Sequence, residues 1–239
     1  MNYLDQVNKI IKLSNLTNII EILSLDKKDI YFVGGAARSI LNDKYDNKDI
    51  DLVIPNLQDS SIEKLDIRFK TKYYPNYKSL AISYNDYDFQ INSFRKDIHS
   101  TGRHTKVAEA KSLQEDSKRR DFTFNSVYIN LLGEVFDFYD GVSHFNDSYL
   151  KFIFDPIEQI QKDYLRAIRY IRFLSLFKST KTSNVDVDAI ILLSKNITEF
   201  VKGNKISKEL KKSHNMYYPE NTLSFLKKHK ELNVFLDYL

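Results

Sequence analysis

Residues 30–54 read IYFVGGAARSILNDKYDNKDIDLVI, and this stretch decides the fold. It begins with a short β-rich apolar run, passes through Gly34 and Gly35 into a helical pattern, and ends on the strand pattern DIDLVI. The two glycines stand between a predicted strand and a predicted helix, where backbone N–H groups and a helix N-terminus can receive a phosphate. A plain tight turn is the alternative at this position.

Two aspartates share one face of the strand predicted over Asp49–Ile54. Because strand side chains alternate, Asp49 and Asp51 face one way while Ile50 and Leu52 face the opposite, buried side. Two carboxylates about 7 Å apart on a rigid strand can hold divalent cations such as Mg²⁺ that bridge phosphate oxygens. This pattern indicates metal-assisted nucleotidyl transfer, with Asp49 and Asp51 as catalytic metal ligands. A solvated aspartate pair is the alternative, and the preceding glycines favour the site.

The flanking sequence predicts an α+β protein in two parts. Apolar residues at helical spacing predict an N-terminal helical segment interrupted near Ser14, and further strands are predicted over 67–73 and 87–93. Beyond Asp155-Pro156 the helical spacing continues and strand signals disappear. We therefore predict a mixed-sheet head domain over residues 1–148 and an all-helical neck domain over residues 149–239.

Composition excludes several classes of protein. The sequence has no cysteine, so neither disulfides nor zinc-thiolate sites can form, and any metal must be bound by oxygen or imidazole. No apolar run approaches the roughly 20 residues that cross a bilayer, and the first residues show no signal-peptide cleavage site. We expect a protein of the cytoplasm with no membrane contact.

The positive charge is concentrated at the C-terminal end. The chain has 36 basic and 32 acidic residues, and the segment from Val201 to Leu239 holds eight lysines against four acidic residues, which accounts for the whole excess of four. Such a surplus is typical of a solvated helix face, but it also fits a surface that follows RNA phosphates. The lysines proposed to bind RNA are Lys205, Lys208, Lys211 and Lys212.

Ordered motifs between about residues 30 and 212 resemble the class II CCA-adding enzymes and bacterial poly(A) polymerases, of the polymerase-β-like nucleotidyltransferase superfamily. The motifs are FVGGAARS (32–39) with DID (49–51), FR (94–95), HSTGRH (99–104), LQED (113–116), RRDFTFN (119–125), EVFDFYDG (134–141), DYLR (163–166) with Arg169 and RF (172–173), and ISKEL (206–210). The resemblance implies a polymerase-β-like head, a helical neck, Mg²⁺ as cofactor, and tRNA, CTP and ATP as partners. It also implies a nucleotide pocket lined by Gly34, Gly35, Arg38, Arg119, Arg120, Asp121, Asn125, Asp163, Arg166 and Arg169.

Asp163 and Arg166 suit base selection for a chemical reason. Residues three apart lie on one helix face. Cytosine and adenine both present an amino donor beside a ring-nitrogen acceptor, so a carboxylate and a guanidinium complement both bases. Uracil and guanine reverse that order and would leave buried acceptors unpaired, at a cost of roughly 1–3 kcal/mol. A helix-surface salt bridge is the alternative here, as a charged helix end is for Arg119 and Arg120.

Some positions depart from the family's pattern. Ser39 and Lys162 stand where relatives usually have Asp and Glu. Gln90 stands where many relatives have a carboxylate, and Asp88, two residues earlier on the same strand face, could substitute for it. Relatives continue into body and tail domains, whereas this sequence stops at Leu239. We expect a minimal RNA nucleotidyltransferase that adds C and A, or only A, to tRNA, with a homo-oligomer or partner subunit replacing the missing domains. A poly(A)-type polymerase and a catalytically weakened RNA- or nucleotide-binding module are the alternatives.

Overall fold

A computed structural model describes residues 2–101 and 104–239, with side chains left out over 99–105, and divides into two compact units. The Gly102-Arg103 pair of the predicted loop motif lies outside the described residues. Unit 1 contains the chain up to Ile98, Lys106–Arg120 and Phe124–Val142. Unit 2 contains Ser143–Leu239, Asp121–Thr123 and the described part of 99–105. The domain boundary predicted at residues 148/149 stays a prediction.

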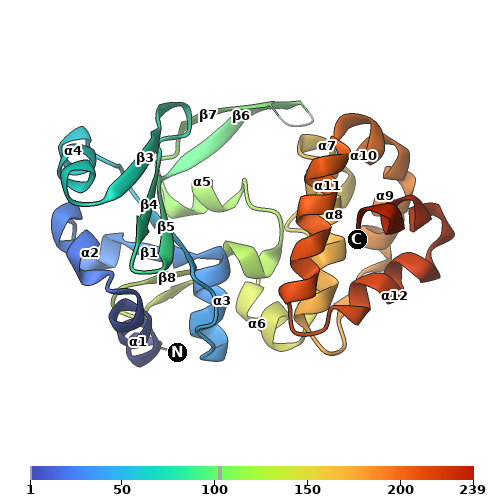
Figure 1. Ribbon diagram of the computed structural model, residues 1–239, viewed down its shortest axis with the longest axis horizontal. Coiled ribbons are helices and arrows are strands. Elements are labelled where there is room, and N and C mark those ends of the chain that lie inside the picture. The colour runs from blue at the N-terminus through green and yellow to red at the C-terminus, as the bar shows by residue number, and fades with distance from the viewer. Residues whose placement is uncertain (1, 102–103) are drawn as a thin grey trace. The chain divides into compact units, whose positions relative to one another are not determined.

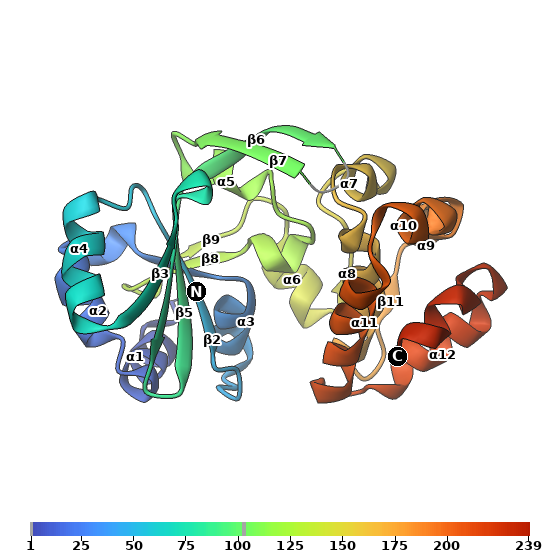
Figure 2. The same cartoon turned by 45° about the horizontal axis from the view of Figure 1, so that its top comes forward.

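Unit 1 is built on a seven-stranded sheet with the strand order β3-β4-β5-β2-β1-β8-β9 (Figure 1). Only the β2–β5 pair of this sheet is parallel. Its strands are β1 (Tyr31–Val33), β2 (Asp49–Ile54), β3 (Lys70–Tyr74), β4 (Ser79–Tyr84), β5 (Tyr87–Ser93), β8 (Tyr128–Asn130) and β9 (Val135–Phe136). The strands β6 (Arg95–Thr101) and β7 (His104–Glu109) run side by side as a separate two-stranded sheet (Figure 2).

The two faces of the large sheet bury different side chains. On one face, Ile50 and Leu52 of β2 join a core with four helices, α1 (Leu4–Ser14), α2 (Thr17–Leu23), α3 (Gly34–Asn42) and α4 (Asp59–Arg68). On the other face, Val53 packs with Tyr31, Val33 and Leu113, the last of these from α5 (Leu113–Ser117). Because strand side chains alternate, Asp49 and Asp51 share the face of Val53. The predicted aspartate pair therefore lies on the α5 side of the sheet.

The segment boundaries of unit 1 agree with the sequence patterns near the N-terminus and differ from them at β3. The N-terminal helical segment is interrupted as predicted, because α1 ends at Ser14 and Asn15 adopts the left-handed conformation that commonly ends a helix. The strand predicted over 67–73 is wrong at its start, since α4 continues to Arg68 and β3 begins at Lys70. The alternating pattern misled the prediction because Ile67 is an exposed helical residue with 87% of its surface accessible.

Unit 2 is mainly helical. Its helices are α6 (Gly141–Asn146, which begins in unit 1), α7 (Pro156–Lys162), α8 (Leu165–Phe173), α9 (Asn184–Leu192), α10 (Ser194–Phe200), α11 (Gly203–Lys211) and α12 (Glu220–Lys228). The expectation of an all-helical neck is wrong at one place, where β10 (Tyr149–Leu150) pairs in parallel with β11 (Lys181–Thr182). Among the described residues, no helix is long and apolar enough to span a membrane.

An aromatic cluster forms the centre of unit 2. The ring of Phe122 lies 4.9 Å from that of Phe152 and 5.5 Å from that of Phe173, and Tyr170 stacks on Phe152 at 5.3 Å. All four side chains are buried. Burial of Phe122 therefore anchors the short segment Asp121–Thr123 in the helical unit, although its neighbours on both sides along the chain belong to unit 1.

Candidate active site

The glycine pair gives backbone atoms close access to the aspartates. Gly34 has a φ of +61°, and a Cβ atom at this residue would lie 3.3 Å from Oδ2 of Asp51. A Cβ atom at Gly35 would lie 2.5 Å from Nδ2 of Asn47. Because glycine adopts a positive φ readily and has no Cβ atom, Gly34 fits this close approach to Asp51. It brings the start of α3 directly against the carboxylate of Asp51.

Asn47 fixes the start of β2, a role that the sequence patterns did not predict. Its Nδ2 donates to the carbonyl oxygen of Asp49 at 2.7 Å, and its Oδ1 accepts from the Asp49 N–H at 3.1 Å. The asparagine therefore clamps the first aspartate's backbone while it packs against Gly35. The available signal was an Asn two residues before a strand, where such local backbone hydrogen bonds are common.

The aspartate pair offers oxygen ligands for a divalent cation. Asp49 is exposed and Asp51 is half-buried, whereas Ile50 and Leu52 between and beside them are buried, as the alternation predicts. Hard divalent cations prefer carboxylate oxygens, so the donor set fits the predicted metal. Within the described residues, no three or more His, Asp or Glu side chains form a cluster for a metal. The donor set at this strand is therefore two carboxylates.

Gln90 places an amide on β5 at the position where the family resemblance leads us to expect a carboxylate. Gln90 lies opposite Asp51 in the register of β2 and β5, and its Nε2 donates to Ser79 at 3.1 Å. Asp88 lies opposite Asp49, and its carboxylate accepts from the Ser83 hydroxyl at 2.6 Å. The structure gives no support to Asp88 as the substitute for a carboxylate at position 90, because Asp88 lies two residues further along β5 and accepts from Ser83.

Arg38 and Asn125 lie together in unit 1. Nη1 of Arg38, on α3, donates to Oδ1 of Asn125, which is 4% exposed, and the guanidinium lies 5.8 Å from the centre of the Phe124 ring. The structure thus brings together two residues that the sequence placed in the nucleotide pocket. The helix that carries Arg38, α3, packs against β1, β2 and β8 of the sheet that also carries Asp51.

Arg119 and Arg120 converge on a fully buried carboxylate. Nε of Arg119 lies 2.9 Å from Oδ1 of Asp116, and Nη2 of Arg120 lies 3.1 Å from Oδ2. Oδ2 also accepts from the Tyr128 hydroxyl at 2.7 Å, and Oδ1 accepts from the Arg95 N–H at 3.1 Å. The two arginines therefore belong to an interior cluster with Asp116, and both side chains are at least 85% buried.

The charges of this cluster stabilise one another. Burial raises the pKa of Asp116, but the guanidinium groups of Arg119 and Arg120 outweigh burial and hold that pKa well below its usual range. Burial lowers the pKa of Arg120, but Tyr128 and Asp116, with a smaller contribution from Asp51, raise it above its ordinary value.

Asp121 and Arg169 form an ion pair in unit 2. Oδ2 of Asp121 lies 2.7 Å from Nη2 of Arg169 on α8, and the Asp121 side chain is 7% exposed against 37% for Arg169. These are again two residues of the predicted nucleotide pocket. Burial of the adjacent Phe122 explains why Asp121 reaches this helix.

Asp163 and Arg166 differ from the expectation that they share one helix face. Asp163 lies in the extended link between α7 and α8, where its Oδ1 accepts from the Leu165 N–H at 3.0 Å. Arg166 lies on α8, is 8% exposed, and donates from Nη1 to Oε1 of Gln159. Within the described chain no ion pair joins Asp163 to Arg166, so the salt-bridge alternative is not supported. The Asp163 carboxylate therefore accepts from the first residue of α8, and Arg166 is the second residue of the same helix.

The four lysines proposed to bind RNA are exposed. Lys205, Lys208 and Lys211 lie on α11, and Lys212 follows it. Lys212 pairs with Oε2 of Glu209 at 3.0 Å, and Oε1 of Glu209 pairs with Arg172 at 3.0 Å. Lys212 is therefore part of the contact between α8 and α11, whereas the described residues offer the other three no ion pair.

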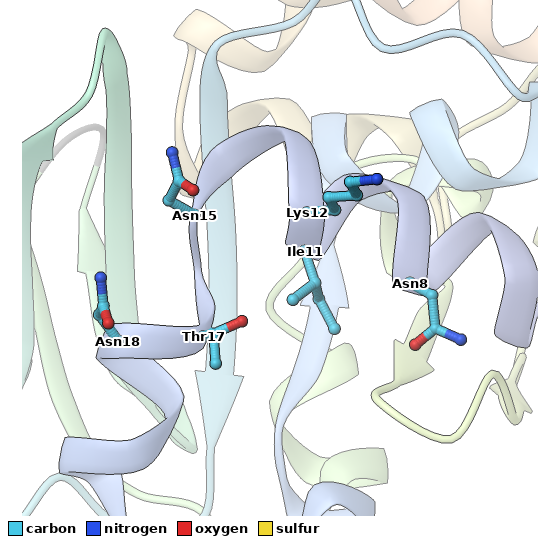
Figure 3. Close-up of a pocket in the computed structure, with 6 residues that line it drawn as sticks. All are labelled: Asn8, Ile11, Lys12, Asn15, Thr17 and Asn18. Carbon is cyan, nitrogen blue, oxygen red and sulfur yellow. The ribbon is translucent and has the colours of Figure 1, made fainter.

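A pocket of about 300 Å³ lies elsewhere in unit 1, against α1 and α2 (Figure 3). Its lining is mostly polar side chains such as Asn8, Lys12 and Asn18. None of the predicted site residues lines it, so it gives no support to the candidate active site.

Comparison with known proteins identifies the family. A family model described as the poly A polymerase head domain matches residues 30–151. The chain belongs to this family. The matched residues begin four positions before Gly34 and include Asp49, Asp51, Arg119 and Arg120.

A curated relative and two solved structures similar to this chain are named as CCA-adding enzymes or CCA tRNA nucleotidyltransferases. The chain is 27% identical over 202 residues to CCA tRNA nucleotidyltransferase 1, mitochondrial, of Homo sapiens, in an alignment that covers 82% of this chain and 46% of the human protein. The chain thus spans less than half of that relative. The Bacillus stearothermophilus CCA-adding enzyme in complex with CTP matches with a TM-score of 0.76 and 20% identity, over 95% of this chain and 53% of that one. The Thermotoga maritima CCA-adding enzyme complexed with tRNA matches with a TM-score of 0.75 and 18% identity, over 97% and 54%. These likenesses confirm the predicted α+β fold.

Proposed function

We propose that this chain is a template-independent RNA nucleotidyltransferase that adds C and A nucleotides to the 3′ end of tRNA. The observation that carries the proposal is the approach of the Gly34 backbone to the Asp51 carboxylate on β2. A triphosphate received at the glycine turn would lie beside the two carboxylates that can hold a divalent cation. The names of the relatives support CTP and tRNA as substrates.

Asp49 and Asp51 would hold the cation, for which we propose Mg²⁺. When bound, the cation polarises phosphoryl oxygens and lowers the pKa of the attacking hydroxyl. The backbone of Gly34 lies close beside the Asp51 carboxylate, so a phosphate at the glycine turn would be near this ligand. Arg38, held by Asn125, is positioned on α3 to bind phosphate or ribose. Arg119 and Arg120 would contribute positive potential while they remain bound to Asp116.

Asp163 and Arg166 would select the base, as donor and acceptor chemistry predicts. Replacing Asp163 by Asn keeps an oxygen that can accept from the Leu165 N–H but places an amide donor where the base offers its amino group. We expect the ratio of CTP and ATP use to UTP and GTP use to fall about tenfold, as the cost of an unpaired buried donor implies. Single-turnover transfer with each nucleotide measures this ratio. An unchanged ratio in a folded variant would remove Asp163 from base selection.

The lysines of α11 would bind RNA phosphates. Charge reversal of Lys205, Lys208 and Lys211 should weaken binding of an acceptor-stem RNA and flatten the salt dependence of that binding. Each phosphate contact that is lost reduces the number of counterions released when the RNA binds. Lys212 is left intact because its partner Glu209 also holds Arg172. Fluorescence anisotropy across a salt series measures both quantities.

The control for this prediction reverses Lys12, Lys64 and Lys70, three exposed lysines of unit 1, and changes the net charge equally. Equal loss of affinity in both triple variants would show that the effect is only one of net charge. Unaltered affinity and salt slope in the α11 variant would show that these lysines form a solvated face.

One assay tests the proposed activity against its alternatives. The protein is incubated with Mg²⁺, tRNA that lacks its terminal nucleotides and each labelled NTP singly and together, and the products are sequenced. CCA addition predicts C from CTP and then a single A, whereas addition of A alone requires a tRNA that already ends in CC. Long A tails would favour a poly(A)-type polymerase, and RNA binding without transfer would favour a binding module. Transfer of none of the four nucleotides would contradict the proposal.

The cellular compartment and the oligomeric state of the protein are also proposals. The lack of cysteine supports a reducing compartment, for which we propose the cytoplasm. The homo-oligomer or partner subunit expected from the sequence stays a prediction.

A further inference from the structure

Gln159 is a buried amide with one end committed and the other unsatisfied. It lies on α7 with 0% of its surface exposed, and its Oε1 accepts the hydrogen bond from Nη1 of Arg166. A guanidinium has only donors, so the amide must present its oxygen to Arg166. Its Nε2 has no hydrogen-bond partner in the described part of the chain.

Packing alone does not account for a glutamine at this place. An unsatisfied buried amide donor is unfavourable, and a Leu or Met side chain of similar size would fill the space without it. What glutamine adds is the acceptor for Arg166. We propose that Gln159 is a positioning residue that sets the orientation of the Arg166 guanidinium for selecting the incoming base. This inference rests on the proposed function.

The neighbouring arginines of α8 also contact acceptors, in their case through ion pairs. Arg169 is held by Asp121 at 2.7 Å, and Arg172 is held by Glu209 on α11 at 3.0 Å. Arginines at three-residue intervals along α8 are thus each held by an acceptor from a different element. A guanidinium donates only in its own plane, so a base can be recognised only when that plane is fixed. Gln159 supplies this constraint to Arg166.

The test compares Gln159→Leu, Gln159→Met and Gln159→Glu. The leucine and methionine remove the acceptor, whereas the glutamate keeps an acceptor oxygen and removes the unsatisfied donor. Gln161→Leu is the matched control, because Gln161 lies on the same helix but is exposed. Calorimetric titration gives the Kd of CTP, ATP, UTP and GTP for each protein, and thermal unfolding confirms that each variant is folded.

We expect the wild-type preference for CTP and ATP to fall about tenfold or more in the leucine and methionine variants. Gln159→Glu should restore discrimination to within about threefold of the wild type, and Gln161→Leu should match the wild type, since a threefold change is under 1 kcal/mol. In the wild type, NMR of labelled arginine should show slow rotation of the Arg166 guanidinium. The same signal should show faster rotation in Gln159→Met. A purely structural role would leave the base preference unaltered.

The outcomes separate this inference from the proposed function. If the wild type discriminates and folded Gln159→Leu or Gln159→Met discriminates equally well, the positioning role is wrong and the proposed function stands. If Gln159→Leu fails to fold, the comparison of Gln159→Met with Gln159→Glu decides. Loss of the preference for CTP and ATP in Gln159→Met, with the preference retained in Gln159→Glu, supports the positioning role. Equal preference in the two variants contradicts it. If the wild type binds all four nucleotides equally, the positioning role is wrong, and the proposed function is decided separately by the transfer assay.

Discussion

Replacement of Asp51 by Asn, or of Asp49 by Asn, is expected to lower the rate of nucleotide transfer by at least about 10³-fold, because loss of a metal ligand removes several kcal/mol of transition-state stabilisation. Folding should be almost unchanged. Asp49 is exposed and Asp51 half-buried, and removing one of two neighbouring carboxylates relieves like-charge repulsion. The midpoint of thermal unfolding should stay within about 3 °C of the wild type. Single-turnover transfer and thermal melts on the same preparations give both values.

Asp88→Asn is the matched control, since Asp88 lies opposite Asp49 on the adjacent strand and its carboxylate binds Ser83. Its transfer rate should remain within a few-fold of the wild type. Residual turnover within tenfold of the wild type in both Asp49→Asn and Asp51→Asn would contradict metal binding by these residues. A large loss in Asp88→Asn alone would place the metal ligand on β5 in place of β2.

Replacement of Asp116 by Asn should destabilise unit 1 by about 3–5 kcal/mol, because removing one partner of a buried ionic cluster leaves uncompensated charge. Two arginines, a tyrosine hydroxyl and a backbone N–H all direct donors at this carboxylate. Urea unfolding at neutral pH measures the change. Because its folded pKa is depressed, Asp116 adds stability above the unfolded carboxyl pKa of about 3.9, and that stability is lost as pH falls toward the folded pKa.

Asp86→Asn makes the same chemical change at an exposed turn residue of positive φ, which asparagine tolerates, and should alter stability by less than about 0.5 kcal/mol. A destabilisation of Asp116→Asn no larger than that of Asp86→Asn would show that the buried cluster contributes little. The difference in unfolding free energy between wild type and Asp116→Asn should shrink as the pH is lowered through the range below 4.

Local patterns predicted the strand that carries the chemistry. The alternation of Asp49, Ile50, Asp51 and Leu52 fixed both the strand and the face of the carboxylates, and β2 begins and ends as predicted. The same alternation failed over 67–73, because a period of two cannot show that the preceding helix still includes Ile67. Short apolar patterns are ambiguous wherever two elements meet without a glycine or proline between them.

Contacts between distant residues explain what the sequence could not show. Gly34 lies close to the carboxylate of Asp51, seventeen positions later in the sequence, and Gly35 lies close to the side chain of Asn47. Arg119 and Arg120 are in the cluster that buries Asp116, which no local pattern distinguishes from a charged helix end. Asp121 joins Arg169 because Phe122 is buried among the aromatic rings of unit 2. Each case depends on burial, which is a property of the tertiary structure.

The cation site at Asp49 and Asp51 is the central claim about this protein, and Mn²⁺ binding tests it most directly. Electron paramagnetic resonance can follow free Mn²⁺ during titration into wild-type protein, Asp51→Asn and Asp88→Asn, each with CTP present and against CTP alone. We predict that wild type and Asp88→Asn bind Mn²⁺ more tightly than CTP alone does, and that Asp51→Asn adds nothing to the affinity of CTP. Equal Mn²⁺ binding by wild type and Asp51→Asn would contradict a metal site at these carboxylates.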